Sequence, residues 1–199
     1  MLTQHLLLAF MWILYCILHS VLASGTVKKC AEKKLQKSFK YYRLFYTLFA
    51  FAGFVFIIYY QIIISSVHLF AVTPLLLIIG FSTMIAGLLI MLVSIKKYFM
   101  SLSGIKTLIS EEPTPNALRI DGVHKYVRHP LYLGTFLFIW GLFILVPLIS
   151  LLIANIIITV YTLIGTAFEE QKLQKEFGTA YTNYQTQVPR IIPSFKRRS

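Results

Sequence analysis

The sequence predicts an all-α integral membrane bundle of about five transmembrane helices, with the N-terminus outside and the C-terminus in the cytoplasm. Hydrophobic residues make up 57% of the 199-residue chain and charged residues only 13%, whereas a soluble domain carries about 25% charged residues. Long apolar runs recur along the chain, and every lysine and arginine lies between or after those runs. A surface with so little charge requires lipid around it.

Three apolar runs occupy the first half of the chain. A membrane-spanning helix needs about 20 mostly apolar residues, because each residue advances about 1.5 Å across about 30 Å of hydrocarbon. The runs therefore predict transmembrane helices over Leu2–Ala23, Leu44–Ser65 and Leu69–Ile95, with a short link at Ser65–His68.

A longer apolar run, Leu131–Phe168, contains no charged residue. As one helix it would extend about 57 Å, which is far more than one span requires. Pro147 lies near its middle, where a proline breaks the helical hydrogen-bond ladder. The sequence therefore predicts a helical hairpin over Leu131–Val146 and Ile149–Phe168, and a total of five spans.

The basic residues fix the expected orientation. They all fall in three segments, residues 24–43, 96–128 and 169–199. With five spans these segments lie on one side of the membrane, and basic loops remain cytoplasmic. A net charge of +12 would suggest nucleic acid in a soluble protein. Between apolar runs it instead predicts the anionic inner leaflet of the lipid bilayer as the partner, and no nucleic acid.

Polar residues gather just before the fourth predicted span. Pro130 suits the first turn of a helix, where its missing N–H costs nothing. The free N–H groups of that turn, with the guanidinium of Arg128, form a potential anion site. The alternative is that Arg128 and His129 only anchor the helix at the lipid headgroups.

A second polar cluster follows the last span. Glu169 and Glu170 end the uncharged run, and ionisable groups near membrane depth are costly and often functional. Glu169, Leu173 and Phe177 share one helical stripe. The alternative is a solvated carboxylate pair that is neutralised by nearby lysines.

Other polar residues give weaker signals. His19 and Ser20, near the inner end of the first span, are a third candidate, although a lone histidine there is more often packed against a neighbouring helix. The spacing of the histidines and of the two cysteines matches no metal-ligand pattern, so the sequence predicts no metal site.

Residues 116–193 contain, in this order, Gly122, Arg128-His129-Pro130, Tyr132, Gly134, Glu169-Glu170, Leu173, Phe177-Gly178, Tyr181, Tyr184 and Val188-Pro189 to Pro193. In their order and spacing these residues resemble the C-terminal signature of the isoprenylcysteine carboxyl methyltransferase family, whose core the phospholipid N-methyltransferases share. Trp140, the Tyr161–Phe168 stretch and His19-Ser20 carry a finer similarity, to the small-thiol (methanethiol-type) S-methyltransferase branch.

The resemblance implies S-adenosyl-L-methionine as methyl donor, bound at the cytoplasmic face. It implies catalytic roles for Arg128, His129 and Glu169, of which the first two would take the donor's carboxylate and the third its ammonium or ribose hydroxyls. Residues 1–199 would then be a single membrane domain, with a three-helix part at 1–95 and a catalytic part at 96–199. The implied cofactor-binding residues are Asn116, Leu118, Arg119, His124, Arg128, His129, Tyr132, Glu169 and Glu170.

The methyl acceptor is expected to be a thiol, a carboxylate or a lipid that arrives from the membrane. Prenylcysteine-processing relatives can carry an arginine one turn before the glutamate pair, where this chain has Gly165, and this departure disfavours a prenylcysteine. Two other functions remain as alternatives: an NADPH-dependent membrane reductase of the sterol-reductase type, and a non-catalytic membrane scaffold.

Overall fold

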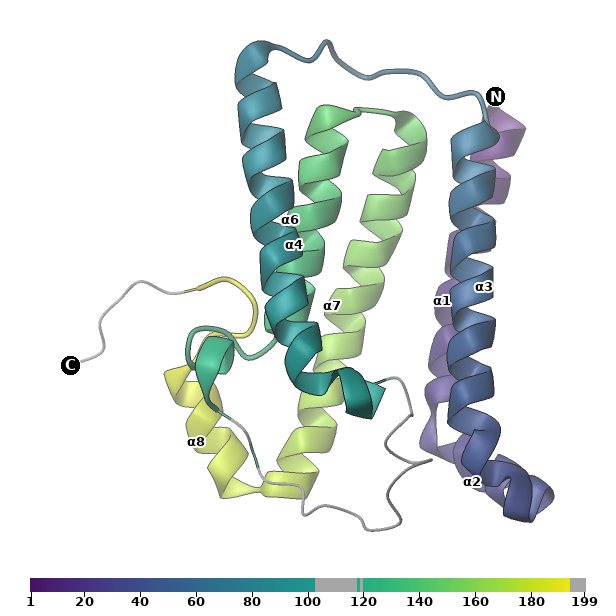
Figure 1. Ribbon diagram of the computed structural model, residues 1–199, viewed down its shortest axis with the longest axis vertical. Coiled ribbons are helices and arrows are strands. Elements are labelled where there is room, and N and C mark those ends of the chain that lie inside the picture. Colours follow the sequence, from purple (N-terminus) through teal and green to yellow (C-terminus); the bar gives the residue numbers. More distant parts are fainter. Residues whose placement is uncertain (103–117, 119, 194–199) are drawn as a thin grey trace. The chain divides into compact units, whose positions relative to one another are not determined.

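The computed structural model describes residues 1–102, 118 and 120–193, and these residues form helices without a strand (Figure 1). This confirms the predicted all-α membrane bundle. The helices are α1 (Leu2–Ala23), α2 (Gly25–Leu35), the 3-10 helix η1 (Gln36–Tyr41), α3 (Tyr42–Ile63), α4 (Pro74–Leu102), the 3-10 helix η2 (Gly122–Lys125), α6 (Pro130–Leu145), α7 (Ile149–Phe177) and α8 (Thr179–Gln187).

Four of the described helices, α1, α3, α4 and α7, are long and apolar enough to cross a membrane. The remaining predicted span, the fourth along the chain, is α6, which is apolar but has only 16 residues. At 1.5 Å per residue it extends about 24 Å, somewhat less than the hydrocarbon core. Pro147 does break the long apolar run, since α6 ends at Leu145 and α7 begins at Ile149.

The structure differs from the sequence prediction in some helix bounds and in the basic segment after α1. The third span begins at Pro74 and not at Leu69, because Thr73 Oγ1 accepts the Leu76 N–H and a proline fits the first helical position. Helix α7 continues to Phe177, well beyond Phe168. The basic segment 24–43, in which no helix was predicted, contains α2 and η1.

The chain divides into two compact units. The first unit contains Met1–Ala71, residues 98–102 and Pro147–Ile158, so it holds α1, α2, η1, α3, the end of α4 and the first ten residues of α7. The second unit contains Val72–Lys97, residues 118 and 120–146, and residues 159–193, so it holds most of α4, η2, α6, the rest of α7 and α8.

In the first unit, α1 and α3 pack side by side around an apolar core of Leu8, Trp12, Ile57, Ile64 and Ala154 (Figure 1). Trp12 Nε1 donates a buried 3.0 Å hydrogen bond to Gln61 Oε1. A polar pair inside apolar surroundings is stable only when both groups are satisfied, and this one joins the two helices.

In the second unit, α4 and α6 approach closely through facing glycines. A Cβ on Gly87 would lie 2.4 Å from Phe138 N and 2.6 Å from Gly134 O. A Cβ on Gly141 would lie 2.6 Å from Met84 N. Small residues at such positions let two membrane helices bring their backbones together. Trp140 Nε1 on α6 donates to Thr159 Oγ1 on α7 at 3.1 Å, which joins the hairpin.

Candidate active site

The start of α6 is fixed by the segment that follows α8. The Arg128 N–H donates to Pro189 O at 2.9 Å, and the His129 N–H donates to Arg190 O at 3.0 Å. Pro130 then opens the helix, as the sequence predicts. These two backbone bonds place the residues before α6 beside the residues after α8.

The side chain of Arg128 points into the protein. Its Nε donates to Glu170 Oε1 at 2.7 Å, and its Nη1 donates to the carbonyls of Gln185 and Val188. The side chains of Arg128 and Glu170 are only 10% and 13% exposed. The alternative of a headgroup anchor does not fit this arrangement. Instead, Arg128 ties the end of α7 to the end of α8.

His129 lies beside the same carboxylate. Its Nε2 is 3.2 Å from Glu170 Oε1, and its Nδ1 is 3.6 Å from Glu169 Oε2. The side chain is 5% exposed, and burial lowers the pKa of His129 below its usual 6.5, despite the opposing effect of the two carboxylates. The imidazole is therefore neutral at pH 7, and it stacks on the Tyr132 ring at 5.5 Å.

The two adjacent glutamates have different environments. Glu170 Oε2 also accepts from Gln185 Nε2 at 3.3 Å, so Glu170 is occupied by protein groups on both oxygens. Glu169 is 45% exposed and, among the described residues, accepts one hydrogen bond, from the Tyr132 hydroxyl at 3.1 Å. Glu169 is therefore the carboxylate of this pair that is open to a ligand.

Arg190 is a member of the cluster that the sequence analysis missed. Its Nε lies 3.7 Å from Glu170 Oε2, which is an ion pair without a hydrogen bond. Within the described part of the chain, its buried Nε and Nη2 atoms have no hydrogen-bond partner. The available signal was its place inside the Val188-Pro189 to Pro193 segment.

A cavity of about 640 Å³ lies next to the cluster. The predicted cofactor residue Leu118 lines it, and so does Val188, whose carbonyl accepts from Arg128. His124 is held close by, since its carbonyl accepts from Tyr184 Oη at 2.6 Å. The remaining lining residues are Ile120, Asp121, Lys125, Tyr184 and Gln187.

The structure thus brings Arg128, His129, Tyr132, Glu169 and Glu170 into one cluster. Leu118 lines the neighbouring cavity, and His124 is bonded to the lining residue Tyr184. The predicted residues Asn116 and Arg119 lie outside the described residues. Residues from α6, α7, α8 and the following segment all contribute, so the cluster exists only in the folded second unit.

Comparison with known proteins gives one family. The sequence model of the phospholipid methyltransferase family matches residues 75–180, which is more than half of the chain. This region contains Arg128, His129, Tyr132 and both glutamates of the cluster. No solved structure matches the chain.

Several curated relatives match a similar region. A methanethiol S-methyltransferase of Crocosphaera subtropica is 35% identical over 45% of this chain and 34% of its own length. One from Pseudomonas deceptionensis is 35% identical over 43% of this chain and 32% of its own length. A protein-S-isoprenylcysteine O-methyltransferase of Schizosaccharomyces pombe is 33% identical over 42% of this chain and 36% of its own length. The match thus covers about a third of each of these relatives.

Proposed function

The chain belongs to the phospholipid methyltransferase family, and we propose that it is an integral membrane methyltransferase that takes its methyl group from S-adenosylmethionine. The observation that carries the proposal is the exposed Glu169 carboxylate, held by Tyr132 beside the buried network of Arg128, His129 and Glu170. One carboxylate free for a ligand, next to one that is fully engaged, is an arrangement suited to binding and not only to folding.

The residues fit this methyl donor in three respects. Its ammonium and ribose hydroxyls need an acceptor, which Glu169 supplies. Its carboxylate needs a donor, and the buried Nη2 of Arg190 has no hydrogen-bond partner among the described residues. Its adenosine needs a partly apolar cavity, and the cavity beside Val188 has a volume within the usual range for small-molecule sites, about 300–1,000 Å³.

In this scheme Arg128 and His129 act mainly as positioning residues. Arg128 holds Glu170 and the end of α8, and the neutral His129 holds Tyr132 by stacking. Bound S-adenosylmethionine would supply a sulfonium methyl that is already activated. The protein then has to align the reactants and exclude water, and alignment alone is worth roughly 7–11 kcal/mol in favourable cases.

We propose a small thiol as the methyl acceptor. Methanethiol S-methyltransferases are among the relatives. Gly165, one turn before the glutamate pair, has no side chain, and an added Cβ there would meet nothing within 4 Å. It therefore offers no cation for the carboxylate of a prenylcysteine. A thiolate acceptor would also need no general base.

Isothermal titration of the full-length protein in detergent tests the donor assignment. Wild type is expected to bind S-adenosylmethionine, and Glu169→Gln is expected to bind it at least tenfold more weakly, because a charge-assisted hydrogen bond contributes about 1.5–3 kcal/mol. Glu176→Gln on the same helix is the matched control and should bind as wild type. Binding of NADPH without binding of S-adenosylmethionine would replace this proposal by the reductase alternative.

A further inference from the structure

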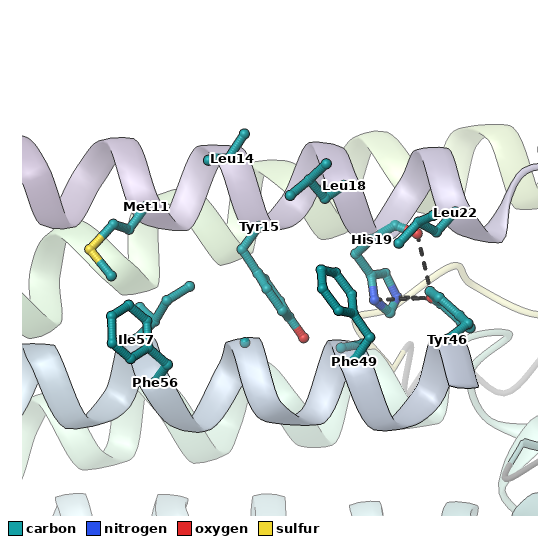
Figure 2. Close-up of a pocket in the computed structure, with 12 residues that line it drawn as sticks. Met11, Leu14, Tyr15, Leu18, His19, Leu22, Tyr46, Phe49, Phe56 and Ile57 are labelled. Atoms are coloured by element: carbon teal, nitrogen blue, oxygen red, sulfur yellow. Dashed lines mark hydrogen bonds between the residues drawn. The ribbon is translucent and has the colours of Figure 1, made fainter. Parts of the chain in front are cut away.

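The first unit contains a second cavity, between α1 and α3, with a volume of about 220 Å³ (Figure 2). Its walls are almost entirely apolar and include Met11, Leu14 and Leu22 on α1 and Phe49 and Phe56 on α3. From Met11 to Leu22 the cavity follows α1 for roughly 17 Å, which is close to the depth of one leaflet, about 15 Å. Its length therefore suits one acyl chain of one leaflet.

The cavity exists because α3 carries a glycine where α1 carries an aromatic ring. An added Cβ on Gly53 would meet only the ring of Tyr15, at 3.5 Å and beyond. That is an ordinary van der Waals distance, so the helices leave a groove at this level and do not close on each other. A groove in an apolar helix pair has to be filled, because an unfilled apolar void forfeits dispersion contacts.

One end of the groove is polar. The Tyr46 hydroxyl lies 3.0 Å from the ring nitrogens of His19 (Figure 2). Tyr42 Oη donates to Leu22 O at 2.8 Å and ties the beginning of α3 to the end of α1 at the same level. Tyrosine and similar amphipathic rings prefer the region where hydrocarbon meets headgroups.

The strongest cluster of positive charge in the first unit begins directly beyond this polar end. The chain leaves α1 at Ala23 and continues into α2 and η1, where Glu32 is the one acidic residue of segment 24–43. Lysines at this position attract anionic lipid headgroups within a Debye length of the surface. The exposed basic side chains are Lys28, Lys29, Lys33, Lys34, Lys37 and Lys40.

We propose that an anionic phospholipid binds the first unit, with one acyl chain in the groove between α1 and α3 and its phosphate against the lysines of α2 and η1. The ester region then lies at the His19–Tyr46 pair. A neutral lipid or a second copy of this chain would fill the groove without using the lysines, and a soluble anion would use the lysines without the groove. An anionic phospholipid uses both.

Quenching of Trp12 fluorescence measures this binding directly. The chain has two tryptophans, so a Trp140→Phe background leaves Trp12, whose ring centroid lies 6.1 Å from that of the groove residue Tyr15. Full-length protein in detergent is titrated with phosphatidylglycerol or phosphatidylcholine, each with brominated acyl chains. Quenching is expected to saturate with both lipids, and phosphatidylglycerol is expected to reach half-maximal quenching at a concentration at least tenfold lower than phosphatidylcholine does. No methyl donor is present, so the result is independent of the proposed enzyme activity.

Two pairs of variants separate the groove from the lysines. Gly53→Leu fills the groove and Gly53→Ala is its control. Lys33→Gln/Lys34→Gln removes headgroup contacts, and Lys172→Gln/Lys175→Gln on α7 is its control. Each test variant is expected to weaken phosphatidylglycerol binding at least tenfold, and each control less than threefold. Leu14→Phe replaces Gly53→Leu if the latter does not fold.

Equal binding of the two lipids would overturn the proposal, and so would absence of saturable quenching. Wild-type affinity in the groove-filling variant would also overturn it, since the lysines would then act alone as a surface anchor.

Discussion

The glycines of the two units have opposite consequences for helix packing. On α4 in the second unit, Gly87 faces Gly134 of α6, and an added Cβ would collide with backbone atoms at 2.4 and 2.6 Å. On α3 in the first unit, Gly53 faces the ring of Tyr15, and an added Cβ would meet that ring at an ordinary van der Waals distance of 3.5 Å. A glycine thus closes a helix pair only where the partner helix is also small at the same level. Opposite a large side chain it leaves a groove.

The polar contacts divide in the same way. The first unit joins its helices through a neutral pair, Trp12 with Gln61, in apolar surroundings. The second unit concentrates ionised groups around Glu170, with Arg128 and Arg190 on either oxygen. Buried charges are costly unless paired, and in the described part of the chain the paired charges gather around Glu170. That place is the candidate active site.

The largest expected effect separates the two adjacent glutamates. Glu170→Gln should lower the free energy of unfolding by about 3 kcal/mol, because it leaves the 10%-exposed Arg128 guanidinium without its counter-ion. Glu169→Gln, at a 45%-exposed position, should change it by less than about 1 kcal/mol. Chemical unfolding in detergent measures both. Equal losses would mean that Glu169 is also structural and would remove the distinction on which the proposed function depends.

The next prediction compares the glycines directly. Gly87→Ala should destabilise the protein by about 1–3 kcal/mol, because the methyl group forces α4 and α6 apart. Gly53→Ala should be neutral or should stabilise by up to about 1 kcal/mol through helix propensity. Thermal unfolding of the two variants side by side is the measurement. A destabilised Gly53→Ala would show that α1 and α3 are in closer contact than the groove requires.

A smaller effect is expected from the neutral pair of the first unit. Gln61→Leu leaves the buried Trp12 N–H without its acceptor and should cost about 1 kcal/mol. A double-mutant cycle with Trp12→Phe measures the coupling free energy between Trp12 and Gln61. A second cycle measures the coupling free energy between Trp140 and Thr159 in the second unit for comparison. The partly buried Trp140 pair should couple less strongly. The reverse order would show that burial does not set the strength of these bonds.

The smallest effect concerns pH. Burial holds the pKa of folded His129 below 6.5, so above pH 6.5 the imidazole is neutral in both the folded and the unfolded chain and contributes no pH dependence. As the pH falls through 6.5, the unfolded chain takes up a proton that the folded chain does not, and stability is lost until the folded pKa is reached. Between pH 6.5 and the pKa of folded His129, the free energy of unfolding of His129→Gln should fall less steeply with decreasing pH than that of wild type. Identical slopes would mean that the folded imidazole titrates normally.

Much of the fold follows from the sequence because lipid leaves few options. The apolar runs predict α1 and α3 to within two residues, and Pro147 predicts the break between α6 and α7. The beginning of α4 was placed too early, because hydropathy continues through Leu69–Val72 while the cap at Thr73 and Pro74 decides the boundary. The expected orientation across the membrane stays a prediction.

The cluster was less accessible to sequence reasoning. Motif order pointed to Arg128, His129 and the glutamate pair, and the structure brings them together. The motif order did not indicate which glutamate is buried. Adjacent side chains on a helix point in directions about 100° apart around its axis, and the direction of α8 decides which of these two sides is covered. Arg190 was missed for a related reason. The carbonyls of Pro189 and of Arg190 itself accept backbone hydrogen bonds from Arg128 and His129, which are far away in sequence, and no local pattern reports these bonds.

Transfer of a deuterated methyl group measures the proposed activity and the role of Glu169 in one experiment. Membranes containing wild type, Glu169→Gln or Glu176→Gln are given deuteromethyl S-adenosylmethionine with methanethiol or an N-acetyl prenylcysteine, and the products are followed by mass spectrometry. Labelled dimethyl sulfide is expected from wild type and from Glu176→Gln, and at least tenfold less of it from Glu169→Gln. Label on the prenylcysteine alone would contradict the proposed acceptor. No labelled product with either substrate, or full activity in Glu169→Gln, would contradict the proposed site.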